Sequence, residues 1–170
     1  MSDFVHLHVH SQYSLLDGQA SIKNLVDKAV DDGMRAIALT DHGSMFGVKE
    51  FYNYVNKKNA PQQAILKNLS KELKALDKEK DADQIKKIED QIEIETQKLF
   101  KPIIGCECYV AHRGRTSKEG RQDMSGWHLV VLAKNKQGYH NLIKMVSQSW
   151  TEGFYMRPRI DKELLEKYHE

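Results

Sequence analysis

The sequence predicts an α/β fold in which strands and helices alternate. Two observations lead to this expectation: residues 36–40 are too apolar on both faces for a solvated strand, and residues 22–30 have the apolar periodicity of a helix lying on a sheet. A third is that polar residues follow directly after such apolar runs. Ligands collect at the carboxyl ends of strands in parallel sheets, whether these form barrels or doubly wound folds. The alternation fits either architecture.

Length and composition narrow the class of protein. A chain of 170 residues can bury the core of one domain, and its 26 basic and 24 acidic residues give no overall charge argument for nucleic-acid binding. There is no apolar run long enough to span a bilayer, and residues 1–20 lack the features of a signal peptide. Cys106 and Cys108 are too close on one strand to bridge sensibly. A soluble protein in a reducing, cytoplasmic setting, with no membrane partner, is expected.

The N-terminal run places His6, His8 and His10 at alternating positions, and Asp17 follows. In an extended strand all three imidazoles would point the same way. Imidazole nitrogen and carboxylate oxygen are ligands for zinc, manganese or iron. The alternative is an apolar strand with incidental histidines, but three on one face followed by an aspartate favour a metal site. His6 lies deeper in this strand and is expected to be a core histidine.

The next elements follow in order. Ser21 is placed to cap a helix that ends near Gly33, and the buried strand 36–40 leads into Asp41-His42-Gly43. The inner stripe of the first helix is expected at Ile22, Leu25, Val26, Ala29 and Val30. A second helix is expected to face the core with Val48, Phe51, Tyr52 and Val55.

Residues 60–101 differ in character from the rest, because they carry nine basic and nine acidic residues, interspersed. We expect two helices broken around residues 81–83, with Asp81 and Gln84 as a capping pair, which together form an inserted αα-hairpin over residues 61–100 without a catalytic role. The two apolar seams are Leu66, Leu69, Leu73 and Leu76, and Ile85, Ile88, Ile92 and Leu99.

The α/β pattern then resumes with a strand over residues 102–110 that contains Glu107. A carboxylate in an apolar strand is costly unless it is paired or bound to a cation, so Glu107 is either a metal ligand or the partner of an Arg or Lys. A fourth strand over residues 127–133 has His128 near its start. Asn135 is placed to cap a helix, and Asp161 begins a short one. The inner stripe of the Asn135 helix is expected at Tyr139, Leu142, Ile143, Val146 and Trp150.

The loop over residues 112–126 is rich in Gly and Ser and is expected to be flexible. Its basic residues are Arg113, Arg115, Lys118 and Arg121. Beside a phosphate site they would attract a nucleic-acid backbone, although an ordinary exposed loop is an equal alternative. Neither a GxGxxG sequence nor a P-loop is present, which argues against nucleotide binding by such motifs.

Three short motifs carry a resemblance to a known family. They are His8-Val-His10-Ser11, Thr40-Asp-His42-Gly43 and Gly105-Cys-Glu107, and they resemble the successive metal motifs of the polymerase and histidinol phosphatase (PHP) family. Further blocks resemble one branch of it, the N-terminal domain of the alpha subunit of bacterial replicative DNA polymerase III. These blocks cover residues 14–18, 47–52, 128–134, 138–142 and 152–161.

The resemblance implies a distorted β/α barrel that holds divalent metal ions, zinc or manganese, which activate water for attack on a phosphate ester. In some polymerase branches this activity is a 3′–5′ exonuclease, and in others the domain is only a scaffold. Polymerisation would use Mg²⁺ on carboxylates outside this chain, with DNA and the other subunits of the replicative holoenzyme as partners. The implied metal ligands are His8, His10, Asp17, His42, Glu107 and His128.

Two departures from the family pattern are visible. The hairpin is an insertion, and the later ligands of the family, a histidine and an Asp-x-His pair, have no counterpart before Glu170. We therefore expect residues 1–170 to be the N-terminal portion of a PHP domain that lacks the rest of its barrel and the polymerase core, and to be inactive alone. The alternatives are a stand-alone phosphatase of the same superfamily and a non-catalytic structural module of the polymerase.

Overall fold

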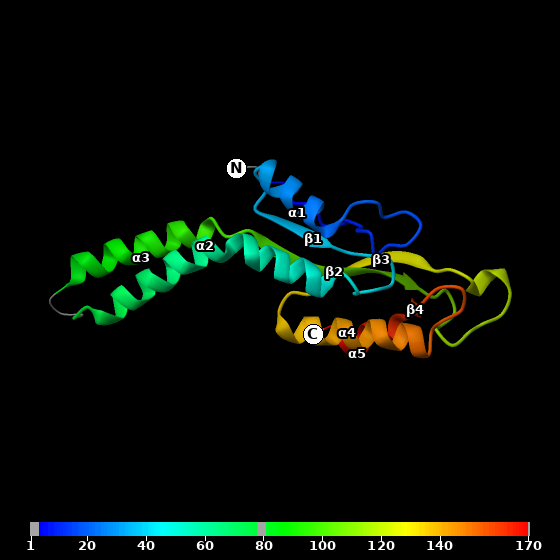
Figure 1. Ribbon diagram of the computed structural model, residues 1–170. Helices are drawn as coiled ribbons and strands as arrows, with labels where there is room; N and C mark the ends of the chain where they lie inside the picture. The colour runs from blue at the N-terminus through cyan, green and yellow to red at the C-terminus, as the bar shows by residue number, and fades with distance from the viewer. Residues whose placement is uncertain (1–3, 78–80, 170) are drawn as a thin grey trace.

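The computed structural model describes residues 4–77 and 81–169, and within them four strands form one mixed sheet (Figure 1). The central strand β2 (Lys101–Val110) pairs in parallel with β1 (Ala36–Leu39) and, near its end, with β4 (Arg159–Ile160). On its other side β2 pairs with β3 (Trp127–Leu132), which runs antiparallel. The mixed α/β architecture confirms the predicted fold class, and β4 is a strand that the sequence did not indicate.

The direction of β3 corrects the expectation of a wholly parallel sheet. A parallel neighbour needs a crossover connection, usually a helix. The chain between β1 and β2 supplies one, but residues 111–126 between β2 and β3 contain only the short 3₁₀ turn η1 (Arg121–Asp123). The chain therefore returns beside β2 in the opposite direction.

Helix α1 (Ile22–Asp31) has the predicted caps and stripe. The Ser21 hydroxyl oxygen accepts a hydrogen bond from the Asn24 N–H, at 3.2 Å, and Gly33 ends the helix with φ 75°. Ile22, Val26 and Ala29 are buried on its inner face. Here the local pattern alone determined the element, because the apolar stripe and both ends are encoded within the thirteen residues from Ser21 to Gly33.

Helices α2 (Val48–Ala75) and α3 (Ala82–Gln97) lie side by side and extend beyond the sheet (Figure 1). The second predicted helix does not end before the hairpin. It corresponds to α2, which is 28 residues long in total, continues through Pro61 and forms the first arm of the hairpin. Tyr52 is about half exposed rather than inward-facing. All eight predicted seam residues are buried or half-buried. The predicted capping pair is wrong, since the Asp81 side chain accepts from the Asp77 N–H instead of capping α3.

The C-terminal helices begin where the sequence indicated. Asn135 caps α4 (Lys136–Thr151) by accepting from the Gly138 N–H, and Asp161 caps α5 (Lys162–Tyr168) by accepting from the Leu164 N–H. The buried face of α4 is rotated relative to the prediction, so that Ile143 and Trp150 are partly exposed. The buried residues of α4 are Asn141, Leu142, Met145, Val146 and Ser149.

Two apolar clusters form the core. One joins α1 and α2 to β1, and the other joins α4 and α5 to the face of β2 that carries Cys106 and Cys108. Figure 1 shows α4 and α5 on the side of the sheet away from α1. Side chains alternate along β2, so Glu107 and Tyr109 point to the face opposite the two cysteines. Among the described residues, no helix has the length and apolar character needed to cross a membrane.

The loop over residues 112–126 is held by ion pairs and is not a free basic segment. Arg113 pairs with the buried carboxylate of Asp123 at 2.5 Å, and Arg115 pairs with Asp161 at 3.0 Å. Arg159 is fully buried and donates to the backbone oxygens of Arg115 and Ser117, both at 2.8 Å. Two of the four basic side chains are thus neutralised, which weakens the expected attraction for nucleic acid.

The junction between α2 and β2 depends on Asn59, and this leads to a first prediction. Its side-chain amide donates to the Phe100 backbone oxygen at 2.8 Å and accepts from the Phe100 N–H at 3.0 Å. Asn59→Ala would leave two buried backbone groups unpaired and should lower the free energy of unfolding by roughly 2–3 kcal/mol. Urea unfolding measures this, with the exposed Asn68→Ala as a control that should change it by less than ~0.5 kcal/mol. Equal effects of the two substitutions would contradict the assignment.

Candidate metal centre

The N-terminal segment runs along β1 without forming a regular strand. The Ala38 N–H donates to His6 O and the Thr40 N–H donates to Val9 O, both at 2.9 Å. A step of two residues from Ala38 to Thr40, at the end of β1, therefore matches a step of three residues in the segment, and an extra residue of this kind breaks the alternation of side chains. The predicted strand is wrong here, and His6 does not share the direction of the other histidines. It is exposed, with its ring edge-on to Phe4, and is not a core histidine.

A second set of contacts ties this segment to the end of β1. The Thr40 hydroxyl accepts from the Val9 N–H at 2.8 Å. The buried carboxylate of Asp41 accepts from the Ser11 N–H and from the Ser14 hydroxyl, both at 2.7 Å. Ser11, Thr40 and Asp41 lie within the motifs that resemble the family, but their role in fixing the ligands was not predicted. The available signal was the position of Asp41, a carboxylate between a buried strand and a candidate ligand.

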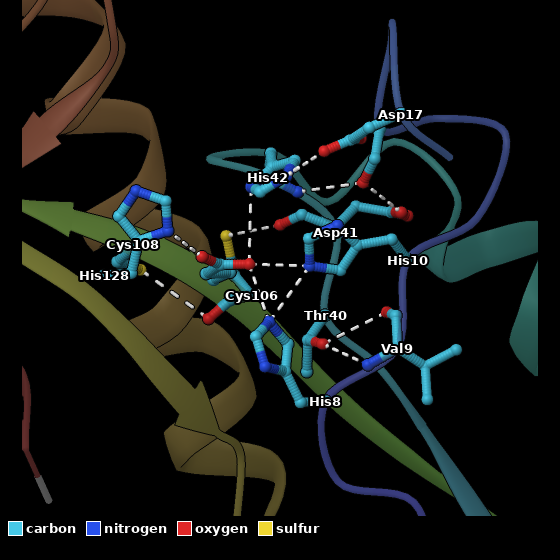
Figure 2. A network of polar contacts seen from close by, with 12 residues as sticks. His8, Val9, His10, Asp17, Thr40, Asp41, His42, Cys106, Cys108 and His128 are labelled. Carbon is cyan, nitrogen blue, oxygen red and sulfur yellow. Dashed lines mark hydrogen bonds and ion pairs between the residues drawn. The ribbon is translucent and has the colours of Figure 1, made fainter. Parts of the chain in front are cut away.

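The centre of the site is Glu107, which is 1% exposed. Its Oε2 atom lies 2.7 Å from His8 Nε2, 2.6 Å from His10 Nε2 and 3.3 Å from His42 Nδ1. His128 Nδ1 contacts the other carboxylate oxygen. Figure 2 shows the imidazole rings of His8, His10, His42 and His128 gathered around one point. The partners of this buried carboxylate are thus imidazoles and not the Arg or Lys of the alternative interpretation.

The sheet register explains how these side chains meet. His42 lies directly opposite Glu107 across the continuation of the parallel β1–β2 pair, and His128 lies opposite Tyr109 in the antiparallel β2–β3 pair. Because β3 is antiparallel, its first residues are beside the carboxyl end of β2. Asp17 completes the group from the following loop, with its Oδ2 2.7 Å from His42 Nε2. The structure therefore brings all six proposed ligands together.

The electrostatics favour ionised carboxylates. Burial raises the pKa of Glu107, but the hydrogen bond from His8 and the charges of His42 and His10 act against it, and the net pKa lies below its ordinary value. The hydrogen bond from His42 lowers the pKa of Asp17. Both groups are thus in the form that binds a cation at neutral pH.

The arrangement fits divalent metal ions. Three groups have their donor atoms within 4.8 Å of one another: His8, His10 and Glu107; His10, Asp17 and His42; and His42, Glu107 and His128. His10, His42 and Glu107 each belong to two groups, so neighbouring positions would share ligands. Among the described residues, His42 Nδ1 is buried without a hydrogen-bond partner, with Glu107 Oε2 3.3 Å away, as expected of an atom that donates to a cation. Nitrogen and oxygen donors of this kind suit zinc or manganese.

Comparison with known proteins agrees with this geometry. The model of the PHP domain family matches residues 6–170. The chain belongs to the PHP domain family. This PHP domain is 41% identical over 172 residues to the DNA polymerase III subunit alpha of Borreliella burgdorferi, a match that covers 99% of this chain and 11% of that protein. The corresponding subunit of Chlamydia pneumoniae is 39% identical, covering 98% of the chain and 10% of that protein, and that of Aquifex aeolicus 37%, covering 99% and 12%. The chain thus spans about a tenth of the length of these relatives.

A second prediction concerns metal content. His10→Ala removes a donor that two candidate positions share, and it should lower the affinity of the PHP domain for Zn²⁺ or Mn²⁺ at least tenfold, on the order of other changes around metal sites. Elemental analysis after loading and dialysis measures this. His6→Ala is the matched control, because His6 lies in the same segment but outside the cluster, and it should leave the metal content unchanged. Equal metal content in all three proteins would contradict the assignment.

Proposed function

We propose that this chain is the N-terminal portion of the PHP domain of a bacterial DNA polymerase III alpha subunit, and that it holds divalent metal ions for phosphoester hydrolysis. The observation that carries the proposal is the convergence of four imidazoles and one buried carboxylate, that of Glu107, at one end of the sheet. The names of the relatives and the small share of their length that is matched support the placement in a larger polymerase subunit.

Some residues of the site would bind the ions, and others fix the positions of these ligands. Ions bound here would neutralise the charge of a phosphate ester and activate water near neutral pH. Glu107, His10 and His42 form the inner part of the site, and Asp41 fixes the loop that carries His42. The side chains of His8 and His128 are each 53% exposed, so the centre is open to solvent on their side. A phosphate ester could approach there.

In the full-length protein we assign to this domain a 3′–5′ exonuclease or related phosphoesterase activity. Polymerisation is assigned to carboxylates outside these 170 residues, with Mg²⁺, and the partners would be DNA and the other subunits of the replicative holoenzyme. A stand-alone phosphatase is less well supported, because the matched relatives are polymerase subunits about ten times as long. A non-catalytic structural module is the remaining alternative.

The third prediction tests this function directly. The full-length protein, loaded with Zn²⁺ or Mn²⁺, should release nucleotides from the 3′ end of single-stranded DNA, and Glu107→Gln should abolish that release while polymerase activity with Mg²⁺ remains. The reason is that the substitution removes the one charge that four imidazoles contact. His6→Ala serves as the control.

Metal binding without hydrolysis would instead support the structural module. The 170 residues alone should be inactive, because the later histidine and the Asp-x-His pair of the family's ligand set have no counterpart among them. Equal hydrolysis by the 170 residues and by the full-length protein would contradict this part of the proposal.

We further propose that the αα-hairpin is an insertion outside the catalytic function. Its helices contact each other and carry interspersed charges, and they extend away from the metal centre (Figure 1). The insertion is shorter than the expected range of 61–100, because Phe100 is buried in the core and is bound by Asn59.

The fourth prediction follows from this boundary. Replacement of residues 62–97 by a short Gly/Ser linker should cost little stability, because the ends of the segment are already close, as the contact between Gln62 and Glu95 shows. The variant should bind as much metal as the wild-type protein in elemental analysis. An insoluble variant, or one that loses its metal, would make the hairpin part of the core.

A further inference from the structure

A cationic side chain outside the ligand cluster is held beside it. The segment that precedes β4 packs on the metal loop at Gly43, the residue after His42, where a Cβ atom would lie only 2.6 Å from Pro158 Cγ. Gly43 has φ 54°, which favours glycine, so this close approach is built into the loop. Arg157 precedes Pro158 and is therefore placed at the outer edge of the site.

Tyr109 connects Arg157 to the ligands. Tyr109 follows Glu107 by two residues on the same face of β2, and Arg157 Nη1 donates to its hydroxyl at 2.8 Å. The guanidinium carbon lies 4.9 Å from the centre of the Tyr109 ring. The same ring stacks on His42, with centroids 5.9 Å apart, and meets His128 edge-on at 4.9 Å. The Tyr109 ring thus contacts both the guanidinium and two proposed ligands.

The charge of Arg157 is available to a ligand. Arg113 and Arg115 are neutralised by carboxylates, and Arg159 is buried among backbone oxygens. Arg157 is exposed, and within residues 4–77 and 81–169 no carboxylate lies at ion-pair distance from it. Met156, directly before it, has φ 62°, a strained conformation for a side chain of this kind, and such strain clusters at ligand-binding segments.

We infer that Arg157 binds a phosphate group of the substrate at the metal centre. The inference rests on the proposed function and deepens it, because it names the residue that recognises the anion. The planar guanidinium matches the oxygens of a phosphate, and the bond to the Tyr109 hydroxyl fixes its orientation while leaving other donors free for the ligand. Tyr109 acts through Arg157 and is a positioning residue. The guanidinium would bind either two oxygen atoms of the phosphate at the metal centre or the phosphate of the adjacent nucleotide.

The fifth prediction tests this by binding rather than by turnover. Calorimetry would measure the affinity of the full-length, Mn²⁺-loaded protein for inorganic phosphate and for a short oligothymidylate. The same measurement on Glu107→Gln identifies the binding that depends on the metal centre, because this variant should lose it. Arg157→Ala should lower the metal-dependent affinity for the oligonucleotide at least about tenfold. It should also reduce the slope of log K against log salt concentration by about 0.7 in magnitude. Arg157→Lys should recover part of the affinity, because it keeps the charge without the planar fork.

The control is Arg35→Ala, which removes an equal charge from an exposed residue directly before β1, at the opposite end of that strand from His42. It should change neither affinity, and elemental analysis should show wild-type metal content in every Arg variant. If Arg157→Ala lowers the affinity for both ligands, Arg157 contacts the phosphate at the metal centre. If it lowers the affinity for the oligonucleotide alone, Arg157 contacts the phosphate of a neighbouring nucleotide.

Two results would overturn the inference: wild-type affinity of Arg157→Ala for both ligands, or no phosphate and no oligonucleotide binding at the metal centre of the wild-type protein. A protein that binds in an Arg157-dependent way but does not hydrolyse DNA would sustain the inference while the proposed exonuclease fails.

Discussion

The burial of the Glu107 carboxylate is the constraint on which the rest of the site depends. A charge that is 1% exposed in an apolar strand is costly unless it is compensated, and here the compensation comes from imidazoles rather than from an Arg or Lys. These imidazoles come from three segments that are far apart in the sequence. The pairing of His42 with Glu107, and of His128 with Tyr109, must therefore be kept in register, since a slip of one residue would turn the ligands to the other face.

The contacts around the cluster serve this register. Thr40 and Asp41 bind the backbone and hydroxyl groups of the N-terminal segment, so the irregular stretch that carries His8 and His10 is fixed without being a strand. On the other side, buried Arg159 closes the loop between β2 and β3 through backbone oxygens. Polar groups that are satisfied in this way stabilise one arrangement of the loops, because any other arrangement would leave buried donors or acceptors unpaired.

The sequence predicted what is encoded locally. The caps at Ser21 and Asn135 were identified because cap residues are visible within short windows. His8, His10 and Asp17 were candidates from the local pattern, whereas the full set of six ligands, with Glu107 and His128, was implied by the resemblance to the PHP family. The direction of β3 was not predicted, because an apolar run has the same pattern in a parallel and in an antiparallel strand. Only the absence of a crossover helix between β2 and β3 determines the direction. The extra residue between His6 and Val9 and the partners of Arg113 and Arg115 depend on distant segments, which a single sequence does not display.

The continuity of α2 has a mechanical consequence. The helix starts at Val48, directly after Gly47, whose backbone is close to Asp41, and at about 1.5 Å per residue it is about 42 Å long. The Asn59 amide, which binds both backbone groups of Phe100, holds it about 17 Å from its first residue. The 11 residues before Asn59 bury Val48, Phe51 and Val55 in the core, whereas the 16 residues after it extend about 24 Å toward Ala75. A load on the outer part of the hairpin is therefore borne by the junction at Asn59 and Phe100 before it reaches the loop that carries His42.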